Sequence, residues 1–411
     1  MRIHCALRFA AIVACVCLLS SRSPAAEKPD IRALTAFVNV DPGTWERQIR
    51  ETVTKLHQAK DAFEHAGYAV QTLRVATQPF PQYMQHLTKE QSMALLHGLD
   101  AIAAKEQFSL AIGPAMLADN DDPRYTDLLT DALTEPHVFV ASLRVAAEDG
   151  VHWKSVRASA HLIRQLADRS PNANFNFAAT AMLGPYGPFF PGAYSAGGGT
   201  RFAIAWQAAN VVAESLAGVH GDVSLAENRL TAAAGLHARA IEHLATDLEG
   251  SLGWPYMGID VSPAPNGEVS IGRAIENFTG TPFGSSGTLS AAALITRVMR
   301  DLPVKEAGYS GMMVPILEDA VLAQRWAQGH ISIDGLLAYS AVCGTGLDTV
   351  PLPGDVSEEQ LAKIIGDMAT LAFKWNKPLT ARLMPAKGKR AGDRTDFQGR
   401  MLVNTILQPL P

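Results

Sequence analysis

The chain has 411 residues, of which 47% are hydrophobic and 18% are charged, a balance typical of a globular protein with a sizeable core. This length corresponds to roughly two or three average domains, although an α/β barrel of this size can form a single domain. The formal net charge of −5 at pH 7 and the lack of a long basic block argue against nucleic acid or an anionic membrane surface as a partner.

The first 26 residues have the features of a secretory signal peptide. Arg2 and Arg8 precede an apolar run at residues 9–19, which is too short to cross a bilayer, and small residues at 23–26 offer a cleavage site. A lipoprotein anchored at Cys15 is the alternative, but apolar residues continue beyond that cysteine. We therefore predict a periplasmic or secreted protein that keeps no membrane contact once the leader is removed.

Strand-like and helix-like patterns alternate along the rest of the chain. Residues 33–40 predict a strand, apolar positions three and four apart predict a helix at residues 44–66, and residues 69–76 predict the returning strand. The remaining predicted strands cover residues 108–113, 138–145, 174–182, 201–206, 256–261 and 379–383. The remaining predicted helices cover residues 154–168, 226–252, 285–299 and 315–328, and a further helix begins with a capping box at Ser357 and Gln360. This alternation predicts a largely parallel sheet, wound or closed, with helices outside it.

Five segments carry a resemblance to a known family. They are residues 258–265, 308–319, 343–355, 379–385 and 388–393, and their order and spacing resemble the domain-of-unknown-function family number 711. The resemblance implies one α/β domain at residues 27–411, a large barrel of about ten strands surrounded by helices and similar to the pyruvate formate-lyase-like fold, and a homodimer.

Two features of the chain depart from the family pattern. Members of the family are usually cytoplasmic, whereas this chain begins with a leader. Many members have a histidine after a Gly-Ala-aromatic triplet, whereas this chain has Ser195 there. No role for that histidine can be transferred to this chain.

Cys343 is the one cysteine that remains after leader removal, so it cannot form a disulfide within the mature chain. Gly344 and Gly346 follow it and offer backbone N–H groups that could stabilise a thiolate, which makes Cys343 a candidate nucleophile. The alternative is a buried structural cysteine, because free cysteines are among the most buried residues and Cys343 follows two apolar residues.

Four carboxylates in the family segments are candidate catalytic residues: Asp260, Glu318, Asp319 and Asp348. If their loops converge, these side chains could divide general acid and base roles or bind a divalent cation through oxygen. The alternative for Glu318 and Asp319 is stabilisation of a helix amino terminus, where acidic residues are favoured by the helix dipole.

Arg382 lies in the last predicted strand, between apolar Ala381 and Leu383, so alternation directs it to the opposite face. There it would bind a carboxylate or phosphate, or form a structural ion pair with one of the acids. Ser262, Tyr309, Gly344 and Gly346 lie in the same segments and are further candidate binding residues.

The kinship of fold with pyruvate formate-lyase raises the possibility of a glycyl-radical cofactor. Gly308 and Tyr309 lie about a hundred residues before the end of the chain, and no segment near the end resembles the radical motif, so we do not expect one. Zinc-hydrolase and serine-hydrolase motifs are also absent from the sequence. We predict an enzyme that acts on a small polar metabolite in a pocket lined by carboxylates, one arginine and one cysteine. The alternative is a periplasmic small-molecule-binding protein without catalysis.

Overall fold

The computed structural model describes residues 28–134, 139–170 and 172–410. The predicted leader lies outside the described residues. Within the described part of the chain, no helix combines the length and the apolar character needed to cross a membrane.

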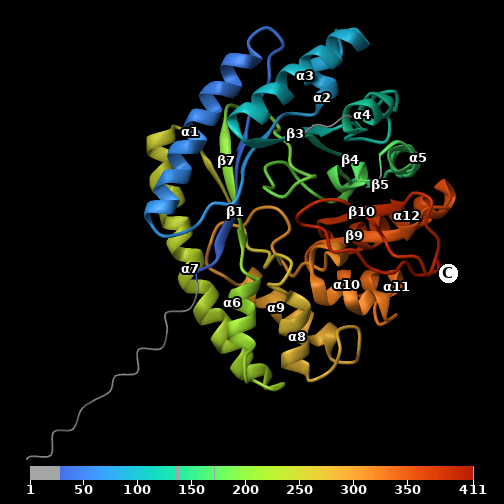
Figure 1. The fold of residues 1–411 in the computed structure, drawn as a ribbon. Helices are drawn as coiled ribbons and strands as arrows, with labels where there is room; N and C mark the ends of the chain where they lie inside the picture. Colours follow the sequence, from blue (N-terminus) through green and yellow to red (C-terminus); the bar gives the residue numbers. More distant parts are fainter. Residues whose placement is uncertain (1–27, 135–138, 171, 411) are drawn as a thin grey trace, which may run out of the picture.

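The central feature of the fold is one mixed sheet (Figure 1). Most of its neighbouring strands are parallel. Its path runs β8-β7-β1-β2-β3-β4-β6-β10-β9, and the short β5 pairs with β4. Antiparallel pairing joins β1 to β7, β6 to β10 and β4 to β5. The strands are β1 (Asp30–Phe37), β2 (Leu73–Ala76), β3 (Phe108–Pro114), β4 (Phe139–Ala147), β5 (Gly150–Val151), β6 (Phe177–Ala181), β7 (Arg201–Gln207), β8 (Tyr256–Asp260), β9 (Gly346–Pro353) and β10 (Leu379–Ala386).

The sheet has about the predicted number of strands, but it is not a closed barrel. Among the described residues, β8 and β9 are the two ends of the strand path and do not pair with each other. The segment at residues 305–315 touches both ends: Ile259 N donates to Lys305 O at 2.8 Å, and Pro315 forms an isolated bridge with Asp348. This segment does not extend as a regular strand, because Gly308 and Ser310 adopt left-handed backbone conformations.

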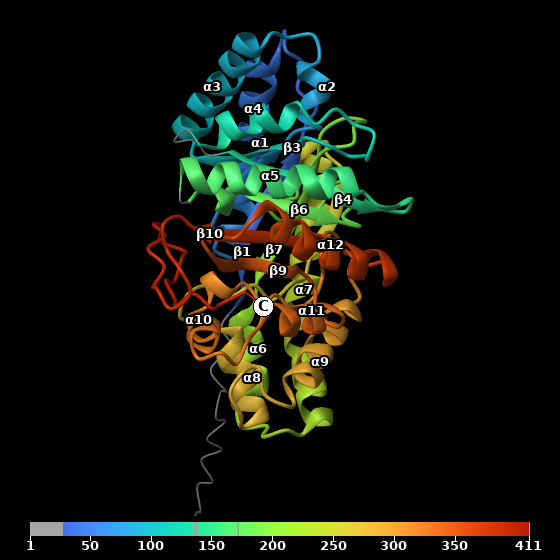
Figure 2. The same cartoon turned by 90° about the vertical axis from the view of Figure 1, so that its right-hand side faces the viewer.

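Helices cover the sheet as predicted. In Figure 1, α1 packs beside α7, and Figure 2 shows α5 and α12 lying together over β6 and β10. The helices are α1 (Trp45–His65), α2 (Phe80–Met84), α3 (Lys89–Glu106), α4 (Tyr125–Thr134), α5 (Trp153–Arg169), α6 (Ala209–Leu216), α7 (Val223–Leu252), α8 (Ile271–Thr279), α9 (Thr288–Arg300), α10 (Ala320–Ala327), α11 (Ile333–Ser340) and α12 (Glu358–Lys374), with short 3-10 turns at Ala173–Asn176 and Ile316–Glu318.

The predicted helix starts at residue 315 and at Ser357 have different outcomes. The capping box of α12 is present, because Ser357 Oγ accepts from Gln360 N and Gln360 Oε1 accepts from Ser357 N. The predicted helix start at residue 315 is wrong. That helix, α10, begins at Ala320 because Asp319 is extended and its side chain caps the free N–H groups of Val321 and Leu322.

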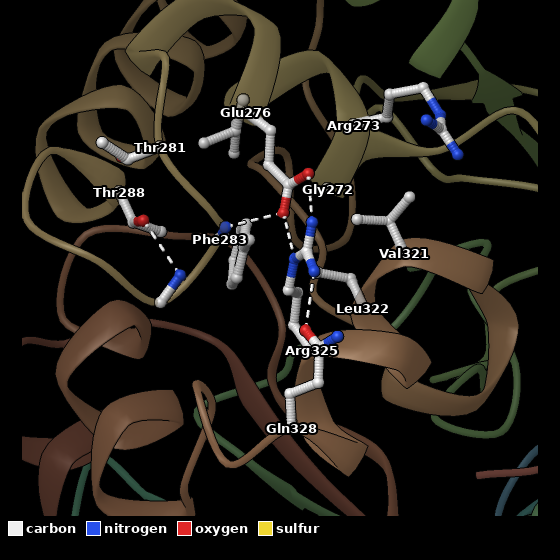
Figure 3. Close-up of polar contacts among 12 residues, drawn as sticks. Gly272, Arg273, Glu276, Thr281, Phe283, Thr288, Val321, Leu322, Arg325 and Gln328 are labelled. Carbon is white, nitrogen blue, oxygen red and sulfur yellow. Dashed lines mark hydrogen bonds and ion pairs between the residues drawn. The ribbon is translucent and has the colours of Figure 1, made fainter.

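A partly buried ion pair joins α8 to α10 (Figure 3). Arg325 Nε donates to Glu276 Oε1 at 2.5 Å, and Arg325 Nη2 donates to Glu276 Oε2 at 2.9 Å. Glu276 Oε1 also accepts from Phe283 N at 2.8 Å, so the carboxylate orders the loop after α8. Neither Glu276 nor Arg325 lines the cavity described below, which makes this pair a useful structural reference.

Candidate functional site

A cavity of about 240 Å³ lies against the strands at the centre of the sheet. Its lining includes Arg32 of β1, Arg74 of β2, Ser109 of β3 and Val140 of β4, which all stand near the amino-terminal ends of these adjacent strands. The lining also includes Asp348 of β9, Arg382 of β10 and Glu318 from the 3-10 turn before α10. The volume suits a small metabolite, since pockets for drug-sized ligands occupy about 300–1,000 Å³.

Strand alternation directs charged side chains into this cavity. Arg74 lies between Leu73 and Val75, and Arg382 lies between Ala381 and Leu383; the apolar neighbours belong to the main hydrophobic core. Because successive side chains of a strand point to opposite faces, each arginine emerges on the side away from that core. The prediction that Arg382 leaves the apolar face is therefore confirmed.

Four of the charged side chains form one continuous ion-pair network. Arg32 Nη2 donates to Glu318 Oε2 at 3.0 Å, and Arg382 Nη2 donates to Glu318 Oε1. Arg382 Nε also donates to Asp348 Oδ1 at 2.8 Å. All four side chains are at least nine-tenths buried. Glu318 is thus held between two arginines, and Arg382 bridges the two carboxylates.

Each arginine of the cavity stacks on a different phenylalanine. Arg74 Cζ lies 4.7 Å from the ring centroid of Phe190, and Arg382 Cζ lies 4.7 Å from that of Phe175. Arg32 makes a longer contact with Phe189, at 6.0 Å. Stacking covers the face of a guanidinium and leaves its N–H groups, which lie in the plane, to form hydrogen bonds.

Arg74 differs from the other two arginines because no carboxylate among the described residues pairs with it. Its Nε donates to Thr72 Oγ1 at 3.2 Å, and its Nη1 donates to Pro188 O at 3.3 Å. Burial and the like charges of Arg32 and Arg382 lower the pKa of Arg74 to about 9, so its guanidinium is still protonated at pH 7. Among the described residues, the cavity lining therefore holds one more guanidinium than carboxylate.

The surroundings of Asp348 perturb the ionisation of its carboxyl. Burial and the nearby charge of Glu318 raise its pKa above the ordinary value, and Arg382 acts in the opposite direction. Oδ1 accepts the hydrogen bond of Arg382, whereas Oδ2 accepts none among the described residues. A carboxyl in this state can exchange a proton with a ligand in the cavity.

Asp260 and Ser262 do not line the cavity. The Asp260 carboxylate accepts from Tyr309 N at 2.7 Å, from Ser310 N at 3.2 Å, and from both the backbone N and the Oγ of Ser262. Burial raises the pKa of the Asp260 carboxyl, and these donors oppose that effect. Because Tyr309 does line the cavity, Asp260 contacts the site only through the loop that it holds.

Asp319 and Cys343 also lie outside the lining. The Asp319 side chain caps α10 and accepts from Ser270 Oγ at 2.6 Å, and burial raises its pKa. Cys343 is fully buried in the hydrophobic core, and burial raises the pKa of its thiol, which disfavours a thiolate. These surroundings agree with the alternative interpretation, that Cys343 is a buried structural cysteine.

The two glycines after Cys343 allow backbone conformations that other residues would not. A Cβ on Gly344 would lie 2.6 Å from the backbone of Gly311, so only glycine permits this close approach of two loops. Gly346 begins β9 with a φ of +92°. Neither residue lines the cavity, although Thr345 between them does.

The structure brings together Glu318, Asp348, Arg382 and Tyr309 from the predicted set, and it adds Arg32 and Arg74. A pattern that could have identified Arg32 and Arg74 is present in the sequence. Each is a single charged residue flanked by apolar residues inside a buried strand, and such a residue has to meet a partner or a ligand. In the described ranges, no three His, Cys, Asp or Glu side chains are grouped so that they could hold a metal ion.

Comparison with known proteins finds similarity along nearly the whole chain. The family model described as Uncharacterised ACR (DUF711) matches residues 25–398. A UPF0210 protein of Pyrobaculum aerophilum is 30% identical over 397 residues, which cover 90% of this chain and 88% of the relative. A UPF0210 protein of Desulforudis audaxviator is 27% identical over 411 residues, which cover 93% of this chain and 91% of the relative. The residues matched by the family model include the whole cavity lining except Met401.

Proposed function

Since the chain belongs to the DUF711 family, as its sequence motifs predicted, we propose that it is an enzyme that acts on a small polar metabolite in this cavity. The observation that carries the proposal is the Asp348 carboxyl, which is buried beside the cavity, has a raised pKa and keeps Oδ2 open among the described residues. Catalytic carboxyls are tuned in this way by burial and by neighbouring charge. We assign Asp348 the role of general base.

Glu318 and Arg382 act as positioning residues in this proposal. Arg382 Nε fixes Oδ1 of Asp348, and Glu318 fixes Arg382 in turn. Asp260 acts on the site only indirectly, because its carboxylate anchors the backbone of the cavity residue Tyr309. For Asp319 and Cys343 we propose structural roles, in the cap of α10 and in the core.

A small-molecule-binding protein without turnover is the second candidate. Three of the four oxygens of Glu318 and Asp348 already accept hydrogen bonds from arginines, which favours a fixed binding surface. Such a protein would need the cavity and its charges but no proton transfer.

A metabolite screen with product detection tests the two candidates. Wild type is compared with Asp348→Asn, and Glu359→Gln on the exposed face of α12 is the matched control. We expect Asp348→Asn to keep the fold and lose about 10²–10⁴-fold in turnover, the usual contribution of a general base. Because only the ionised carboxyl can act as a base, wild-type turnover should rise with pH through the raised pKa of Asp348. Equal turnover in both proteins would refute the assignment, and binding without product in either would favour the binding protein.

We also propose that the chain is exported and forms a homodimer, with a fold akin to that of pyruvate formate-lyase-like proteins. The leader-like residues 1–26 support export, and the family resemblance supports the other two features. Mass spectrometry of the periplasmic fraction should find the chain without its leader, and light scattering should find twice the chain mass. An intact leader on cytoplasmic protein, or a monomer, would contradict the respective proposal.

A further inference from the structure

The charge of the cavity specifies the ligand more closely than its size does. Three guanidiniums, of Arg32, Arg74 and Arg382, face two carboxylates, of Glu318 and Asp348. A buried charge without a counter-charge is costly, so an excess guanidinium beside an open cavity favours a ligand that carries a negative group.

Two of the three arginines are already committed to carboxylates. Arg382 uses Nε for Asp348 and Nη2 for Glu318, and Arg32 uses Nη2 for Glu318. Arg382 was the predicted anion contact, but an incoming anion at Arg382 would have to compete with both acids. Arg74 has no such competitor among the described residues.

The contacts of Arg74 fix the orientation of its guanidinium before a ligand binds. Thr72 Oγ1 accepts from Nε, Pro188 O accepts from Nη1, and the ring of Phe190 covers one face. Among the described residues, Nη2 donates no hydrogen bond. A guanidinium with a fixed plane and a free donor binds the oxygens of a carboxylate or phosphate with little loss of conformational entropy.

We propose that Arg74 binds the anionic group, a carboxylate or a phosphate, of the ligand that occupies this cavity. The inference rests on the proposed function in one respect, that the cavity is the ligand site. It adds the ligand class and the residue that recognises it. The anionic group anchored at Arg74 would leave the rest of a small ligand within the cavity that Asp348 also lines.

Binding of simple anions tests the proposal without requiring a substrate. Inorganic phosphate and acetate are titrated separately into the full chain by calorimetry, with the thermal midpoint measured in parallel. We expect one of the two to bind wild type and raise its midpoint, which identifies the anion class. Arg74→Gln should weaken that binding by about tenfold or more, since it removes a charge-assisted hydrogen bond to the anion.

Two variants separate ligand binding from loop anchoring. Thr35 Oγ1 donates to the same Pro188 carbonyl at 3.2 Å but does not line the cavity, so Thr35→Val disturbs the loop contact and keeps the charge. Thr35→Val should bind the anion like wild type. Arg74→Lys keeps a charge on β2 and should retain part of the binding, and it replaces Arg74→Gln as the informative variant if the latter fails to fold.

Each outcome decides the proposal. Binding of neither anion to wild type, or equal binding by wild type and a folded Arg74 variant, would overturn it. Anion binding through Arg74 without turnover of any metabolite would leave this inference standing and defeat the enzyme proposal. Turnover of a neutral metabolite that is lost in Asp348→Asn, without anion binding, would support the enzyme proposal and overturn the inference about Arg74.

Discussion

Glu318 provides the sharpest test of the buried charge network, because its carboxylate pairs with two arginines. Its Oε2 accepts from Arg32 and its Oε1 accepts from Arg382, and only 4% of its side chain is exposed. Glu318→Gln keeps the shape of the side chain and removes its charge. The amide nitrogen then replaces one carboxylate oxygen and faces an arginine donor, so one buried arginine N–H group loses its acceptor.

The loss of stability expected for Glu318→Gln follows from the number of charges in the cavity. Wild type has three guanidiniums against two carboxylates in the cavity, and the variant has three against one. Removing one partner of a buried ion pair costs about 3–5 kcal/mol, because the remaining charge stays buried without compensation. A domain is stable by about 5–15 kcal/mol, so a loss of this size is large but can still leave a folded protein to measure.

Urea unfolding followed by circular dichroism measures this loss, with two glutamates as controls. Glu276 pairs with Arg325 with 16% of its side chain exposed (Figure 3), and Glu359 pairs with Lys363 with 79% exposed. The Glu→Gln series should lose stability in the order Glu318, Glu276, Glu359, and the last change should be too small to detect.

The reasoning would be refuted by a Glu318→Gln protein whose unfolding free energy lies within about 1 kcal/mol of wild type, the range of an exposed pair. It would also be refuted if Glu276→Gln cost more than Glu318→Gln. A loss in Glu318→Gln that an added anion partly reverses would support an uncompensated positive cavity.

The remaining predictions concern residues outside the cavity lining. Gly308→Ala should destabilise the protein by more than about 1 kcal/mol in urea unfolding, because Gly308 has a φ of +68° and a Cβ there would lie 2.2 Å from Asp260 Oδ2. Gly329→Ala is the control, with a similar φ of +77° and open space around the Cβ, and an equal loss in both would contradict the proposed clash. Cys343 should react with a thiol reagent only as the protein unfolds, since its side chain is buried and its thiol pKa is raised; rapid labelling of the native protein would disprove this.

Much of the fold follows from local patterns in the sequence. Alternating strand and helix periodicities indicated a largely parallel sheet with helices outside, and the capping box at Ser357 marked the start of α12. Alternation along one strand was enough to place Arg382 on the face away from the core. The predicted start of α10 at residue 315 was wrong because the helix begins where the side chain of Asp319 accepts from the free N–H groups, and Pro315 lies before this point.

The candidate site was harder to predict because residue type does not reveal the partner. Asp260 and Asp348 both follow apolar residues in family segments, yet Asp260 is enclosed by backbone donors and Asp348 lines the cavity. The sequence left both chemistry and packing open for Cys343 and its glycines, with the apolar approach favouring a buried cysteine, and their surroundings favour packing.

Periodicity within each element therefore specified the class of fold and the face on which a charged residue stands, since these depend on neighbours along the chain. The composition of the cavity depended on contacts between distant segments. Arg32 and Glu318 are 286 residues apart in sequence, and their ion pair exists only because β1 and the turn before α10 meet in the folded chain. The excess guanidinium of Arg74 is likewise a property of the assembled cavity, because it follows from the positions of Arg32, Arg382 and the two carboxylates among the described residues.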